Sequence, residues 1–171
     1  SMYSHNQLYG RWTINRLSTV MKWNRTLRVE FLTNKFAVRL WSATDVEIIP
    51  TSKEESHPFI AKLGPDILDA SCTPSLIYDR LKSKKFYNRN ASSLMLDQSF
   101  IAGIGNYLRS EILHQSGIHP SAKPRSLSDD KIQSWAETTK FLSELSYDTG
   151  GFTVSEKVAL AGKQRGEPKR A

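Results

Sequence analysis

The chain has 171 residues, of which 39% are hydrophobic, and this length suits one domain or two small ones around a buried core. Its 24 lysines and arginines outnumber 17 acidic residues, and the excess is unevenly placed. Segments 1–29 and 80–90 each carry five basic residues and no acid, whereas segment 41–79 carries seven acids and two lysines. This distribution fits one basic face turned toward a polyanion, and it equally fits an ordinary solvated basic surface.

The composition excludes several classes of protein. Cys72 is the only cysteine, so neither a disulfide framework nor a zinc site built on thiolates is expected. The four histidines show no metal-ligand spacing. No apolar run approaches the length of a membrane span, and no signal peptide is recognisable. We therefore expect a cytoplasmic protein with no metal, no cofactor and no membrane partner.

The first third of the chain alternates apolar and polar residues with a period of two. Segments 27–33 (LRVEFLT) and 35–41 (KFAVRLW) show the alternation, and a short polar turn around Asn34 separates them. This pattern predicts a β-hairpin. Shorter strands are expected at 9–14 (YGRWTI) and 46–49 (VEII). Strands with helices still to come indicate an α+β layout.

Beyond residue 68 the period changes to that of helices. Thr73 and Pro74 form a typical helix start, N-cap then first turn. Ser128 is placed to cap a helix over 129–145, whose inward stripe includes Trp135. From Gly150 the periodicity fades. We therefore expect four parts: a partial N-terminal β-domain over 1–62, a linker over 63–68, a helical domain over 69–150 and a flexible basic tail over 151–171.

Residues 96–112 (LDQSFIAGIGNYLRSEI) place two glycines between segments that otherwise favour helix. Gly103 and Gly105 predict a helix, a tight turn and a second helix. The backbone N–H groups at the start of that second helix attract anions, and Asn106 can either cap the helix or donate to a phosphate oxygen. Arg109 lies one turn further on. An ordinary helical hairpin, with glycines that permit close packing, is the alternative interpretation.

Three stretches resemble a single family. Residues 96–120 (LDQSFIAGIGNYLRSEILHQSGIHP) resemble the helix–two-turns–helix (H2TH) signature of the formamidopyrimidine glycosylase and endonuclease VIII family of DNA repair enzymes. Residues 3–12 (YSHNQLYGRW) and 57–68 (HPFIAKLGPDIL) resemble its endonuclease VIII branch in particular. The resemblance runs from about Tyr3 to Tyr147. It implies an α+β fold in which a partial antiparallel β-domain precedes a helical H2TH DNA-binding domain.

The resemblance also implies roles for particular residues. The family binds duplex DNA, preferably damaged or abasic, and flips the damaged base out of the stack. Gln7, Leu8 and Tyr9 match the stretch that fills the resulting void, and their types suit that role because apolar and aromatic wedges replace lost stacking while an amide can bond an orphaned base.

The glycine turn matches the family's phosphate-binding element. Asn106 matches its phosphate-contacting asparagine, supported by Gly103 and Gly105 and by the first amides of the second helix. We add Arg109 to this set from its position one turn into that helix. These four residues are therefore the expected phosphate site.

The family's chemistry is the removal of oxidised pyrimidines by DNA glycosylase and AP lyase steps. It uses an N-terminal proline as nucleophile and a neighbouring glutamate, both upstream of the region that matches Tyr3. We therefore expect no catalytic residue in this chain, and an inactive or weakly active protein. At the other end, Lys169 and Ala171 stand where the first two cysteines of the family zinc finger are expected, so we expect that finger to be absent.

Two alternatives remain open alongside this hypothesis. One is a non-catalytic duplex DNA- or RNA-binding protein, because H2TH elements also occur in a ribosomal protein. The other is a residual enzyme that uses a different amine, and borohydride trapping would detect it. In addition, we expect strands left without neighbours to expose β-edges and to favour self-association.

Overall fold

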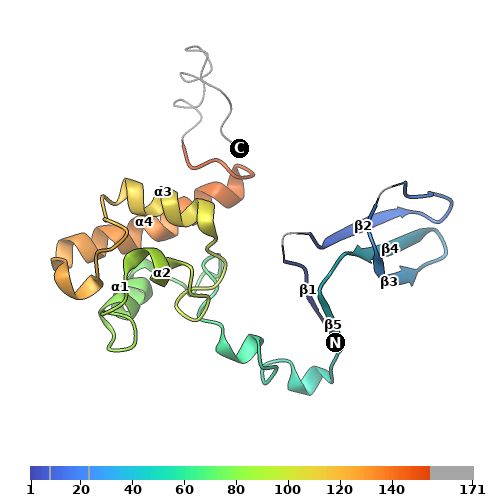
Figure 1. The fold of residues 1–171 in the computed structure, drawn as a ribbon, viewed down its shortest axis with the longest axis horizontal. Helices are drawn as coiled ribbons and strands as arrows, with labels where there is room; N and C mark the ends of the chain where they lie inside the picture. Colours follow the sequence, from blue (N-terminus) through green and yellow to red (C-terminus); the bar gives the residue numbers. More distant parts are fainter. Residues whose placement is uncertain (8, 23, 155–171) are drawn as a thin grey trace, which may run out of the picture. The chain divides into compact units, whose positions relative to one another are not determined.

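The computed structural model describes residues 1–7, 9–22 and 24–154. The chain divides into two compact units, the first from Ser1 to Ala61 and the second beginning at Lys62 (Figure 1). In the described residues all strands belong to the first unit and all α-helices to the second. Strands followed by helices confirm the predicted α+β fold class.

The larger sheet of the first unit has three antiparallel strands in the order β2–β4–β3. β2 spans Arg11–Arg16, β3 spans Leu27–Leu32 and β4 spans Phe36–Trp41. The β3–β4 pair is the hairpin that alternation predicted, with one register irregularity between Leu27 and Val29. β4 lies in the centre, and its Ala37 and Leu40 are fully buried.

One face of this sheet is apolar and exposed. The register pairs Ile14 with Val38 and Phe31 with Val38, so these side chains lie on the same side of the sheet. Trp12 and Phe31 stack on each other at 6.3 Å between ring centroids. Ile14 is 70% exposed and Phe31 48%. The apolar sheet face, as we call it, comprises Trp12, Ile14, Phe31 and Phe36.

A second, two-stranded sheet joins the chain's first residues to the end of the unit. β1 (Met2–His5) pairs antiparallel with β5 (Asp45–Ile48). β5 was expected from its sequence, whereas β1 was not. Four residues without clear alternation give no strand signal, and β1 exists because it pairs with a partner some 40 residues later in the chain. Short 3₁₀ helices follow at Thr51–Lys53 and Ile60–Lys62.

Up to residue 154, the last that the structure describes, the second unit packs four α-helices around one hydrophobic core (Figure 1). They are α1 (Pro74–Lys82), α2 (Ala91–Met95), α3 (Asn106–Gln115) and α4 (Asp129–Asp148), with a 3₁₀ turn at Pro124–Ser126 before α4. Both predicted caps form. The Thr73 hydroxyl accepts from the Leu76 amide at 3.2 Å, and the Ser128 hydroxyl accepts from the Lys131 amide at 3.4 Å.

Helix α4 is the longest element and supports the other helices. It packs against α1 and α3 along the predicted stripe, in which Ile132, Trp135, Thr139 and Leu142 are buried. Its Lys140 is also buried, and the ammonium donates to the carbonyls of Ile67 and Asp69. These bonds fix the segment that enters the helical unit.

Two of the expected segments, the linker over 63–68 and the tail over 151–171, contain residues that are buried. Within the expected linker, 63–68, Ile67 is buried and belongs to the helical core. Within the expected tail, Thr153 is buried and its carbonyl accepts from the Gln115 side chain of α3 at 3.2 Å. Both segments are held by backbone contacts that local composition does not reveal. The rest of the expected tail, 155–171, lies outside the described residues.

Candidate nucleic-acid interface

The turn between α2 and α3 is longer than the sequence predicts. Apolar residues and helix formers favoured helix up to residue 101, but α2 ends at Met95. Asp97 explains the early end, because its carboxylate accepts from the Ser99 amide at 2.8 Å and its carbonyl accepts from the Phe100 amide at 2.8 Å. Aspartate bonds of this kind compete with helix and favour turns. Ten residues, 96–105, therefore separate the two helices.

Gln98 holds this turn together from the inside. Its Oε1 accepts from the Gly103 amide at 2.9 Å, and its Nε2 donates to the carbonyls of Ile104 at 3.0 Å and Leu96 at 3.2 Å. One amide side chain thus satisfies three backbone groups across the turn. Gln98 was not among the residues predicted from the sequence to form the site. The available signal was a polar residue followed by a largely apolar run up to the glycines.

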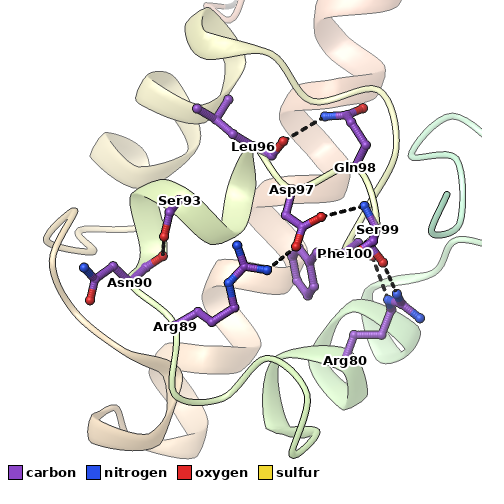
Figure 2. Close-up of polar contacts among 9 residues, drawn as sticks. All are labelled: Arg80, Arg89, Asn90, Ser93, Leu96, Asp97, Gln98, Ser99 and Phe100. Atoms are coloured by element: carbon purple, nitrogen blue, oxygen red, sulfur yellow. Dashed lines mark hydrogen bonds and ion pairs between the residues drawn. The ribbon is translucent and has the colours of Figure 1, made fainter. Parts of the chain in front are cut away.

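Two arginines attach the turn to the helices beneath it. Figure 2 shows Arg80 of α1 donating to two successive carbonyls, those of Ser99 and Phe100, each at 2.7 Å. Arg89, in the loop before α2, pairs with the Asp97 carboxylate. Burial alone would raise the pKa of Asp97, but bonds from Ser99 and Arg89 outweigh it and the pKa lies below its usual range. The turn is rigid for these reasons.

The segment that enters the helical unit forms a third support. The Gly64 amide donates to the Gln98 carbonyl at 2.8 Å, and the Ala102 amide donates to the Pro65 carbonyl at 2.9 Å. The backbones approach so closely that a Cβ at Gly64 would lie 2.6 Å from the Phe100 carbonyl oxygen. Only glycine fits there. This contact accounts for Gly64 within the junction motif 57–68.

The two glycines of the turn have different physical roles. Gly103 has φ of +100°, which other residues rarely adopt, and a Cβ there would lie 3.1 Å from the Ile67 side chain. Gly105 has φ of −105° and ψ of −178°, which any residue adopts, and a Cβ there would meet nothing within 4 Å. The fold therefore requires glycine at 103 but not at 105. The space above Gly105 is open to an external group.

The start of α3 offers uncapped donors beside that open space. Gly105 is the N-cap residue and no side chain caps the helix, so the capping role considered for Asn106 is not adopted. Asn106 is the first helical residue and is exposed. Within the described part of the chain, the side chains of Asn106 and Arg109 make no hydrogen bond or ion pair. The amides, the amide side chain and the guanidinium together form a donor set suited to an anion.

The expected void-filling stretch lies in the other unit. Leu8 falls outside the described residues. Gln7 has φ of +44°, and Tyr9 is 68% exposed. The turn around them is tight, because the Gly10 amide donates to the Asn6 carbonyl at 2.7 Å and a Cβ at Gly10 would lie 2.5 Å from that of Asn6. Tyr9 therefore sits on a constrained turn with its ring largely free.

The described ranges contain neither a metal-ligand cluster nor a membrane-spanning helix. There, no group of three or more histidine, cysteine, aspartate or glutamate side chains is arranged to hold a metal ion. Cys72 is buried, and desolvation raises the pKa of its thiol. No helix in the same ranges is long and apolar enough to cross a membrane.

Comparison with known proteins agrees with this architecture. Residues 63–157 match the model of the formamidopyrimidine-DNA glycosylase H2TH domain. Endonuclease 8 of Klebsiella pneumoniae is 42% identical over 157 residues, covering 92% of this chain and 60% of that protein. Endonuclease 8 of Pectobacterium carotovorum is 41% identical over 155 residues, covering 91% and 59% respectively. The chain thus spans about 60% of the length of these relatives.

Solved structures show the same fold. The formamidopyrimidine-DNA glycosylase of Lactococcus lactis, non-covalently bound to DNA containing an AP site, superposes with a TM-score of 0.73 at 19% identity, covering 88% of this chain and 57% of that one. Its complex with N7-benzyl-Fapy-dG DNA gives the same TM-score of 0.73. Since the H2TH model matches more than half of the residues, this chain belongs to the formamidopyrimidine-DNA glycosylase and endonuclease VIII family of DNA repair proteins.

Proposed function

We propose that this chain binds duplex DNA by holding a backbone phosphate at the turn before α3. The observation that carries the proposal is the open space at Gly105 beside the uncapped start of α3. A phosphate oxygen there would accept from the first amides of α3 and from the Asn106 side chain. The guanidinium of Arg109, one turn along, would add charge. Gly103 allows the positive φ that the turn needs, and it adds no side chain that would hold the DNA strand away.

We further propose that Gln7, Leu8 and Tyr9 recognise damage in that duplex. A flipped or missing base leaves a gap in the stack, and an exposed aromatic ring on a tight turn can fill it. Tyr9 has that exposure, so its ring can serve an external role without loss of core packing. The preferred partner is therefore DNA with an abasic or flipped-out nucleotide. Such DNA occurs in repair reactions of the endonuclease VIII type, which remove oxidised pyrimidines.

The proposal assigns binding roles to Gln7, Leu8, Tyr9, Gly105, Asn106 and Arg109, and it assigns a catalytic role to no residue of the chain. A lysine that forms a Schiff base must be unprotonated and free to reach the sugar. Lys140 is engaged with two carbonyls and with Glu144 at 3.2 Å. The hydrogen bond from Lys82 to Asp129 raises the pKa of that ammonium. Neither lysine is therefore prepared for nucleophilic attack.

Fluorescence anisotropy with matched duplexes, with and without an abasic-site analogue, tests the binding roles. Asn106→Ala should weaken binding to both duplexes alike, by about tenfold, because a hydrogen bond to a charged phosphate is lost. Tyr9→Ala should weaken binding mainly to the abasic duplex, by about fivefold or more, because stacking is lost only there. Gln133→Ala, an exposed amide on α4, is the matched control and should leave both affinities unchanged.

Three results would contradict the proposal. Equal affinity of wild type and Asn106→Ala for both duplexes would remove the phosphate site from the glycine turn. A covalent adduct trapped by borohydride on the abasic duplex would show that the chain supplies an amine nucleophile after all. Stronger binding to duplex RNA than to duplex DNA would favour the alternative nucleic acid.

A further inference from the structure

An open hollow of about 480 Å³ lies beside the phosphate site proposed above. It is lined by α2 and its two cap residues (Asn90, Ser92, Ser93, Leu96), by Pro120 and Ser121 of the loop after α3, and by Arg109 of α3. The loop is fixed against α2 by backbone bonds, from the Ala91 amide to the Ala122 carbonyl at 2.8 Å and from the Ser92 amide to the Pro120 carbonyl at 2.9 Å. The hollow is therefore a built feature of the helical unit and does not depend on a loose loop.

Three of the polar side chains that line the hollow have no partner within the described part of the protein. They are Asn90, Ser92 and Arg109. Asn90 is the N-cap residue of α2, yet its side chain does not cap the helix. Figure 2 shows its amide turned away from Ser93, whose hydroxyl bonds instead to the Asn90 carbonyl at 3.0 Å. An amide, a hydroxyl and a guanidinium thus remain available to a common ligand.

The chemistry of the hollow selects an anion. Its lining contains one arginine and no carboxylate, so its formal charge is positive. The amide, hydroxyl and guanidinium all donate, as the tetrahedral oxygens of a phosphate require. Because a helix rises about 1.5 Å per residue, Arg109 lies about 6 Å along α3 from Gly105. In one DNA strand phosphates recur about every 3.4 Å of the duplex axis, so a phosphate close to the first can reach the hollow.

We propose that this hollow is a second phosphate-binding pocket, in which Asn90, Ser92 and Arg109 hold a backbone phosphate of the strand whose neighbouring phosphate lies at Gly105. The inference rests on the proposed DNA-binding function and assigns it a second point of contact. It also gives Arg109 a separate task from Asn106. Two adjacent phosphates held on one rigid element fix the direction of the strand as well as its position.

A double-mutant cycle with Asn90→Ala and Arg109→Gln tests whether these residues share one phosphate. Each single change should weaken duplex binding about fivefold to tenfold. The loss of affinity in the double variant should be smaller than the product of the two single losses, by a factor of about three or more. Arg109→Gln should also reduce the magnitude of the log–log salt slope by about 0.9, whereas neutral Asn90→Ala should leave it unchanged. Arg109→Lys should keep the slope and still lose affinity, because it lacks the planar fork.

The same titrations separate failure of the pocket from failure of DNA binding as such. If Asn106→Ala weakens binding while Asn90→Ala is silent or strictly additive with Arg109→Gln, the pocket is refuted and the turn stands. If none of the three variants weakens binding, both the phosphate site at the turn and the second pocket are refuted. Repeating the cycle with inorganic phosphate in place of chloride, at equal ionic strength, distinguishes the occupants. Free phosphate should compete for the pocket and weaken wild-type binding more than binding by Asn90→Ala, and equal weakening of both proteins would overturn a phosphate site there. Thermal unfolding of each variant confirms that it folds.

Discussion

At the scale of single residues, the two glycines of the H2TH turn differ in role: the fold requires Gly103, whereas Gly105 leaves space for a ligand. The sequence marked both as unusual and left two explanations, close packing or room for a ligand. The backbone assigns one explanation to each: Gly103 has the positive φ and the nearby Ile67 side chain, and Gly105 has neither. Spacing could not distinguish them, because the difference lies in dihedral angles and in a neighbour from another segment.

Alanine at each position should therefore give opposite results. Gly103→Ala should destabilise the helical unit by about 1–3 kcal/mol, because alanine is strained at φ of +100°. Gly105→Ala should change stability far less but weaken DNA binding, because its methyl group enters the space proposed for phosphate. Thermal unfolding and anisotropy measured on both variants check this contrast. A stable Gly103→Ala protein, or a Gly105→Ala protein with full affinity, would break it.

At the scale of elements, prediction succeeded where the signal was local. The β3–β4 hairpin follows from alternation across a short turn, and the starts of α1 and α4 follow from Thr73 and Ser128. The end of α2 at Met95 could not be predicted from local sequence signals. Gln98 bridges to Gly103, and Arg80 reaches carbonyls about 20 residues later in the chain. Bonds of that kind override the helix propensity of 96–101 and carry no sequence pattern.

The turn should be sensitive to acid through Asp97. Its bonds from Ser99 and Arg89 lower the pKa of the folded carboxyl below the value in the unfolded chain. Stability from this group is therefore present above the unfolded pKa, about 3.9, and is lost as the pH falls through the folded value. Wild type should lose stability steeply below about pH 4. Asp97→Asn should be less stable at neutral pH and less pH-dependent; identical acid profiles would contradict this role.

At the scale of the whole molecule, the two units differ in how completely they bury apolar residues. The helical unit encloses Trp135, Phe100 and Ile112 in a continuous core. The strand unit leaves its apolar sheet face open, with Ile14 70% exposed, and its outer strands β2 and β3 have no further neighbour among the described residues. Exposed apolar patches and free β-edges are the features through which chains associate. The strand unit is thus the part least able to remain stable alone.

We therefore expect the chain to self-associate through the apolar sheet face, in a concentration-dependent way that sedimentation velocity can follow. Ile14→Lys places a charge on that face and on an edge strand, and should shift the protein toward monomer.

Leu32→Lys is the matched control: Leu32 is 64% exposed, but its register with Ala37 puts it on the opposite face. Both variants add the same charge, so general repulsion predicts equal effects, whereas association through the apolar sheet face predicts that only Ile14→Lys dissociates. A wild-type protein that stays monomeric at every concentration would rule out this mode of association. The apolar sheet face would then remain exposed to solvent in a stable monomer.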